Sequence, residues 1–130
     1  MVEARYGVAP ALVARFRDVF AKFVKAVREA VAEAAGKPEF AQTAAFDSWR
    51  TKALPLLEQG NASIQAAAAA FEHGDAQPIL VQAEDKRGLA KDLDGFALTF
   101  AGPEQAEKLD ALETAVVMTA YQICAAAGIP

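Results

Sequence analysis

The fold is decided by residues 10–36, which read PALVARFRDVFAKFVKAVREAVAEAAG. Apolar side chains recur in this stretch at alternating steps of three and four residues, the spacing that aligns them on one face of an α-helix. The stripe consists of Val13, Phe16, Phe20, Phe23, Val27, Ala30 and Ala34. Pro10 suits the first helical position, where its missing N–H has no bond to make, and Gly36 with Pro38 suits the end. The sequence therefore predicts one long amphipathic helix over residues 10–35.

A second helical region is predicted to begin at Pro38-Glu39. Its apolar side chains keep the same spacing, at Phe46, Trp49, Ala53 and Leu56. Pro55 lies inside this pattern and removes one backbone hydrogen bond, so we expect a kink or an end near Leu54. Gly60-Asn61 predicts a break or a second kink, before a further helical piece over residues 64–72.

Residues 73–78 hold the strongest turn signal of the chain, with His73-Gly74-Asp75 followed by Pro78. The following residues, 79–101, fit either a helix or short strands. Helical spacing relates Leu89, Leu93, Phe96 and Phe100, and a two-residue alternation relates Phe96, Leu98 and Phe100. We favour a helix, because a strand would need a sheet that no other segment supplies.

The last helix is predicted to open at Gly102-Pro103-Glu104 and to close at Gly128. Its apolar stripe is Leu109, Leu112, Val116, Thr119 and Ile123. About a quarter of all residues are alanine, the strongest helix former. Together these features predict a single all-α domain over residues 1–130, built as an antiparallel bundle of about four helices.

The composition excludes several classes of protein. Hydrophobic residues make up 54% of the chain, which is too many for intrinsic disorder, yet no uncharged apolar run is long enough to span a membrane. Met1–Gly7 lacks the basic start and apolar core of a signal peptide, so we expect a cytoplasmic protein and leave export without a cleaved signal open. The single Cys124 excludes an intramolecular disulfide.

The sequence also predicts no metal, no cofactor and no catalytic set. It has one histidine, His73, and no cysteine pair, so the usual donor sets for zinc or haem are missing. Cys124 lies among alanines without an evident base, which predicts a small buried residue rather than a nucleophile. Asp92-Leu93-Asp94-Gly95 lacks the other ligands of a calcium loop.

Charge is divided unevenly along the chain. Residues 1–57 carry nine Lys or Arg against six Asp or Glu, a net +3, and residues 58–130 carry four against eleven, a net −7. The first helix holds Arg15, Arg17, Lys22, Lys25 and Arg28. This basic helix could meet an anionic partner, or it could face the acidic half within one bundle or across a dimer. We favour the second interpretation, and the overall net charge of −4 argues against nucleic acid.

Residues 10–77 resemble the helical hairpins of the WXG100 type, small partners and substrates of type VII secretion. The resemblance depends on an alanine-rich second arm with Phe46, Trp49, Leu57, Ile64, Ala67, Ala68, Phe71 and Asp75. Trp49 is followed by Arg50-Thr51, so the Trp-x-Gly turn of that family is missing. The resemblance implies a helical interaction protein that pairs with itself or with a sister chain.

Our leading prediction is a non-enzymatic helical bundle that acts through protein–protein contact, with itself or with another protein. The predicted contact residues are Phe16, Phe20, Phe23, Trp49, Arg17 and Arg28. The aromatic stripe also allows two other interpretations, a bundle core that binds an apolar small-molecule ligand and a face that lies on an anionic membrane surface. A third alternative is a small enzyme that uses scattered carboxylates and arginines.

Overall fold

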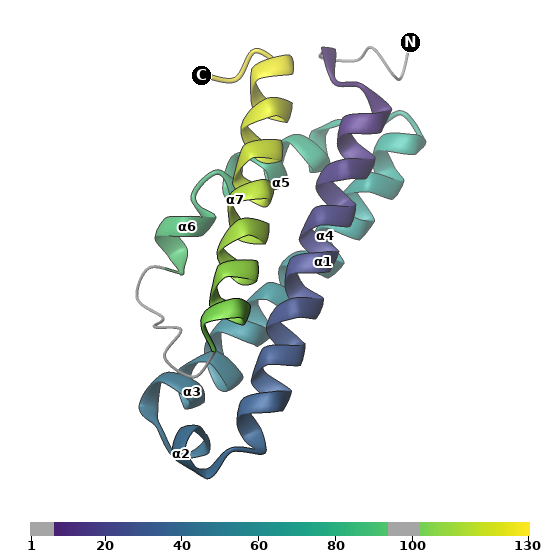
Figure 1. Ribbon diagram of the computed structural model, residues 1–130. Coiled ribbons are helices and arrows are strands. Elements are labelled where there is room, and N and C mark those ends of the chain that lie inside the picture. Colours follow the sequence, from purple (N-terminus) through teal and green to yellow (C-terminus); the bar gives the residue numbers. More distant parts are fainter. Residues whose placement is uncertain (1–6, 94–101) are drawn as a thin grey trace.

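The protein folds into an all-helical bundle, seen in a computed structural model that describes residues 7–93 and 102–130. The body of the bundle consists of α1 (Pro10–Ala35), α4 (Leu54–Glu72), α5 (Gln77–Lys86) and α7 (Pro103–Ala126). In Figure 1, α1 runs opposite to both α4 and α7 and packs against both, and α5 bridges α4 and α7 on the other side. The described residues contain no strand. The predicted all-α antiparallel bundle is confirmed.

Short helical pieces connect α1 to α4. They are α2 (Pro38–Ala41), α3 (Ala44–Ser48) and a π-helical turn, η2 (Trp49–Ala53), which continues directly into α4. The side chain of Thr43 caps α3, because its hydroxyl oxygen accepts a hydrogen bond of 3.2 Å from the backbone N–H of Phe46. The wider π turn precedes Pro55, whose ring crowds the preceding turn and which lacks an N–H. The helix does not end near Leu54, which was one of the two outcomes predicted from Pro55; a π-helical turn leads into α4 there instead.

The predicted break at Gly60-Asn61 is wrong, because α4 continues through both residues without interruption. A glycine inside a helix costs about 1 kcal/mol relative to alanine, which packing against the rest of the bundle readily offsets. The turn predicted at His73-Gly74-Asp75 is confirmed. Gly74 has a φ of 95°, a conformation that favours glycine, and α4 ends just before it at Glu72.

The described part of the ambiguous residues 79–101 consists of helices joined by turns and contains no strand. Residues 79–86 belong to α5, and α6 (Leu89–Asp92) follows after Gly88. The predicted face of Phe96 and Phe100, and the alternative strand that includes Leu98, lie outside the described residues.

The aromatic stripe of α1 fills the centre of the bundle. Phe16 and Phe20 have no exposed surface, and Phe23 is about as fully buried. Ile64 and Phe71 from α4 and Val116 and Ile123 from α7 are buried in the same core. The heptad-like spacing of α1 is therefore used within one chain, to pack α1 against two neighbouring helices.

The start of α1 and the end of α7 lie at the same end of the bundle (Figure 1). Gly7, just before α1, has a φ of 76°, and a Cβ atom placed on it would lie 2.5 Å from the carbonyl oxygen of Ala126. Only glycine permits this close approach. Among the described helices, none has both the length and the apolar character needed to cross a membrane.

Candidate binding groove

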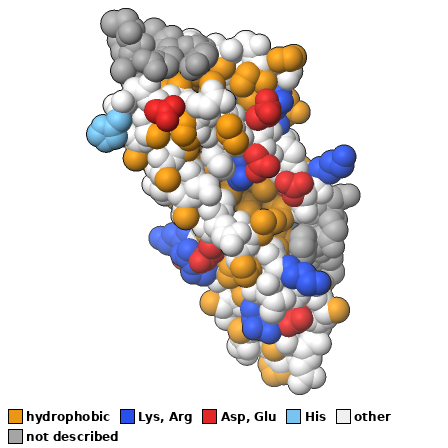
Figure 2. Space-filling view, turned by 180° about the vertical axis from the view of Figure 1, so that it is seen from behind, with side chains coloured by type: hydrophobic (Ala, Val, Ile, Leu, Met, Phe, Trp, Pro, Cys, Tyr) orange, Lys and Arg blue, Asp and Glu red, His pale blue; other side chains and the backbone are white. Residues whose placement is uncertain are grey.

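A groove of about 430 Å³ opens between α4 on one side and α5 with α6 on the other. Its floor contains Phe20 of α1 and Leu57 of α4. The walls are made by Leu56, Gln59, Gly60 and Ser63 of α4, by Val81, Gln82, Asp85 and Lys86 of α5, and by Leu89 and Asp92 of α6. Figure 2 shows hydrophobic side chains gathered in a hollow at the middle of this face, with acidic side chains beside them.

The bundle forms the groove at this point because α5 is much shorter than the helices it packs against. It has 10 residues, whereas α4 has 19, and the chain turns after Lys86. The short α6 continues the wall, so the two walls consist of one long helix and two short ones.

Gly60 brings the groove floor close to the backbone of α4. A Cβ atom at Gly60 would lie 3.1 Å from Cζ of Phe20 and 3.4 Å from Cε of Lys86. The first distance is shorter than an ordinary van der Waals contact between carbon atoms. The missing side chain thus lets the Phe20 ring and the Lys86 stem pack against the helix.

The lips of the groove are apolar and exposed. Leu56 on α4 is 51% exposed and Val81 on α5 is 53% exposed. Only two other large hydrophobic side chains in the described part of the chain are comparably exposed, Met118 and Tyr121, and both lie on α7. Exposed apolar side chains that border a hollow with both apolar and polar walls are typical of binding sites.

The groove also holds a buried cation. The side chain of Lys86 is only 11% exposed, and its ammonium pairs with the carboxylate of Asp85 and donates a 3.4 Å hydrogen bond to Gln82. The ammonium lies 5.8 Å from the centre of the Phe20 ring, within reach of a cation–π interaction. Lys86 and Asp85 neutralise each other, so the exposed carboxylate of Asp92 leaves the groove rim with a net negative charge.

Most of the residues predicted for contact lie elsewhere. Phe16, Phe23 and Trp49 are buried in the core of this chain, and Phe20 reaches the groove only as part of its floor. A partner could touch the other three only if the bundle opened. Of the aromatic side chains of α1, only Phe20 borders the groove, and the buried rings of Phe16 and Phe23 offer no surface on the outside of the bundle.

The two predicted arginines lie on the surface and have partners within the chain. Arg17 pairs with Asp18 at 3.1 Å, and Arg28 pairs with Glu58 of α4 at 2.9 Å. The second pair joins the basic first helix to the acidic half of the chain, as one of the two interpretations of the charge division supposed. Such exposed pairs contribute about 0–1 kcal/mol each to stability.

Sequence reasoning missed the residues that define the groove. The spacing places Leu56 with the apolar residues Phe46, Trp49 and Ala53, and Val81 lies in the range 79–101, which fits either a helix or short strands. No local signal distinguishes Lys86 from a solvated lysine. Its burial depends on the glycine opposite, which was interpreted as a helix break.

Two ionisable groups of α7 have shifted pKa values. Burial, and secondly the nearby carboxylate of Asp110, raise the pKa of Glu113 above its ordinary value of 4.5. Burial also raises the pKa of the Cys124 thiol, with Glu84 adding to the shift and Arg87 opposing it. The thiol is 1% exposed, as predicted for a small buried residue. A raised pKa makes the thiolate scarcer and the thiol less reactive.

The raised pKa of Glu113 predicts how stability depends on pH. An acid whose pKa is higher in the folded state destabilises the fold once it ionises, so stability falls as pH rises above about 4.5. Glu113→Gln should therefore raise the melting temperature at pH 7, and the gain should shrink as the pH is lowered toward 4. Calorimetry at several pH values measures this, with the exposed Glu107→Gln as the control. A gain independent of pH would contradict the assignment.

Within residues 7–93 and 102–130, no group of three or more His, Cys, Asp or Glu side chains is arranged to hold a metal ion. Comparison of the whole chain with protein-family models, with curated proteins and with solved structures returned no match. The resemblance of residues 10–77 to WXG100-type hairpins therefore stays a prediction.

Proposed function

We propose that this chain is a non-enzymatic interaction protein that binds a segment of a partner protein in the groove between α4 and α5–α6. The observation that carries the proposal is the pair of exposed lips, Leu56 and Val81, on opposite sides of an apolar floor. Covering both lips removes apolar surface from water, which stabilises the complex by about 25 cal/mol per Å² of that surface.

The rim indicates what the partner segment contains. Lys86 is already paired with Asp85, whereas Asp92 is exposed beside the apolar floor. A complementary segment carries one or two apolar side chains followed by a lysine or arginine, so that its cation lies near Asp92. The net −7 of residues 58–130, which contain most of the groove, attracts a basic segment from a distance.

Site-specific photocrosslinking tests this proposal. A photoreactive phenylalanine analogue placed at Val81, in cells that make the protein, should crosslink to one partner, which mass spectrometry identifies. The same analogue at Met118, exposed to a similar extent but outside the groove, is the control. No adduct at Val81, or the same adduct at Met118, would contradict a groove-bound partner.

A substitution at Leu56 then measures how much the lip contributes to the affinity for the partner. The purified partner should bind Leu56→Asp at least about tenfold more weakly, because a charge placed on the lip loses hydration when the partner covers it. Met118→Asp should bind like the unaltered protein. Isothermal titration calorimetry measures both affinities, and circular dichroism melts check that both variants fold. Equal affinities for the two variants would overturn the proposal.

A small apolar ligand is a second candidate for the same groove. Its volume of about 430 Å³ falls in the range of ligand sites, about 300–1,000 Å³. Native mass spectrometry of the purified protein distinguishes the two, because a co-purified ligand adds a fixed mass that Leu56→Asp should remove and Met118→Asp should retain.

A further inference from the structure

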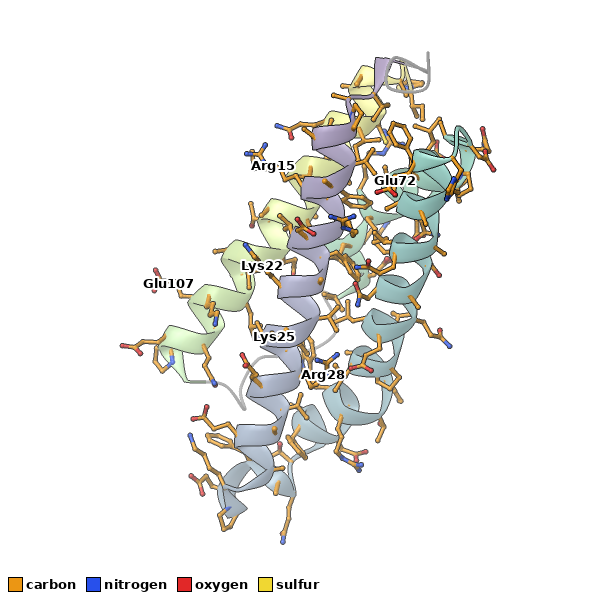
Figure 3. The ribbon with its side chains drawn as sticks, turned by 90° about the vertical axis from the view of Figure 1, so that its right-hand side faces the viewer. Arg15, Lys22, Lys25, Arg28, Glu72 and Glu107 are labelled. Atoms are coloured by element: carbon orange, nitrogen blue, oxygen red, sulfur yellow. The ribbon has the colours of Figure 1, made fainter. Side chains whose placement is uncertain are left out.

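A second hollow, of about 360 Å³, lies on another side of the molecule, between α1 and α7. Three lysines from the two helices meet there, Lys22 and Lys25 of α1 and Lys108 of α7. Ala26 and Leu112 provide an apolar surface between them. Figure 3 shows Lys22 and Lys25 along the length of α1, while Glu107 of α7 points away from them.

These lysines differ from two of the three arginines of α1 in how they are paired, whereas Arg15, like the lysines, has no ion pair within the described residues. Arg17 and Arg28 both form ion pairs, the second with Glu58 of α4. In the described part of the chain, none of the three lysines forms an ion pair with a carboxylate. Two arginines of α1 are thus paired, one of them across to α4, whereas the three lysines lie together without such pairs at the α7 side.

The cluster is not explained by its contribution to the fold. Glu29 also borders the hollow, which leaves a local net charge of +2 from the three lysines and this one carboxylate. Like charges held near one another destabilise a folded chain, and their repulsion is relieved when an anion is bound. The hollow therefore suits a ligand with at least two negative charges.

We propose that the hollow between α1 and α7 binds an acidic segment of a protein, with two or more Asp or Glu side chains placed among Lys22, Lys25 and Lys108. The apolar surface of Ala26 and Leu112 accepts the methylene groups of those side chains. This is a different surface from the groove, and it takes a segment of the opposite charge.

Two observations favour an acidic segment over an extended polyanion. The chain has a net charge of −4, and Glu104, Glu107 and Asp110 are exposed on the same stretch of α7 as Lys108. These carboxylates repel a nucleic acid or an anionic membrane, whereas a short segment can enter the hollow without meeting them. The hollow also lacks arginine, whose planar fork is the better match for phosphate.

Fluorescence anisotropy with a labelled hexaglutamate peptide tests the proposal. At an ionic strength of about 0.15 M, charges more than about 8 Å apart are largely screened, so the measurement reports local contacts. The double variant Lys22→Glu/Lys25→Glu should weaken binding at least about tenfold. Lys52→Glu/Lys91→Glu is the matched control, because it changes the net charge equally at two exposed lysines outside the hollow. The control variant should bind the peptide with an affinity within about threefold of that of the unaltered protein, a change much smaller than the tenfold loss expected of Lys22→Glu/Lys25→Glu.

Each other outcome overturns the proposal. Equal losses in the two double variants would mean that only net charge matters, and no binding by the unaltered protein would exclude the site. Inorganic pyrophosphate and vesicles containing phosphatidylglycerol are the competing probes. If either binds more tightly than the peptide and depends on Lys22 and Lys25, the hollow recognises phosphate instead. Circular dichroism melts confirm that both double variants remain folded.

Discussion

Replacing Phe20 by alanine should lower the free energy of unfolding by about 3–5 kcal/mol, the loss typical of removing a fully buried aromatic ring. The ring has no exposed surface, and its Cζ atom lies 3.1 Å from the point where a Cβ atom of Gly60 in α4 would be. Removal of the ring leaves a cavity beneath the groove. It also takes away the ring near which the buried ammonium lies.

Urea denaturation followed by circular dichroism measures this loss. Leu56→Ala is the control, because Leu56 lies in the same groove but is about half exposed, and it should change stability by less than about 0.5 kcal/mol. The experiment also distinguishes a core role for Phe20 from a contact role. If Phe20→Ala instead left the stability unchanged and dissociated an oligomer in light scattering, the ring would belong to an interface between chains.

Gly60→Val should destabilise the protein by about 1–3 kcal/mol, although valine is intrinsically a better helix former than glycine. The Cβ atom alone would approach the Phe20 ring to 3.1 Å, and two further methyl groups have no space unless the ring or the Lys86 stem moves. Overpacking therefore outweighs the gain in helix propensity.

Ala62→Val is the matched control for that substitution. It adds two methyl groups at an exposed position of the same helix, where only the lower helix propensity of valine acts, about 0.6 kcal/mol or less. Thermal and urea unfolding of the two variants compare the effects directly. If Gly60→Val were as stable as the unaltered protein, the close packing of Phe20 against α4 would be wrong.

The first and last helices, α1 and α7, could be predicted from the sequence because the residues that mark their bounds are local signals. Pro10 and Gly36 mark the bounds of α1, and Gly102-Pro103 marks the start of α7, in agreement with the structure. The interior of α4 was not predictable in the same way. Gly60 is unfavourable for a helix on its own, and what keeps it helical is the packing of Phe20 and Lys86 from two other helices.

The groove depends on the same kind of non-local information. The spacing of apolar residues predicts that Leu56 belongs to a helix. Whether another helix covers its side chain depends on the length of α5, which forms the opposite wall of the groove. The stripe of α1 shows a related ambiguity, because heptad spacing describes a seam between chains and a core within one chain equally well. The positions of α4 and α7 decide between them for Phe16 and Phe23, which are buried within one chain.

The start of α1 and the end of α7 lie at the same end of the bundle, and this placement has a mechanical consequence. A molecule held at Gly7 and Ile129 is pulled along neighbouring, oppositely directed helices, so the load falls first on the contact between Gly7 and the end of α7. The contacts between α1 and α7 then break one after another, beginning at that end. Held at Gly7 and Gly36 instead, at opposite ends of α1, the same bundle loads all the contacts of that helix together and resists a larger force.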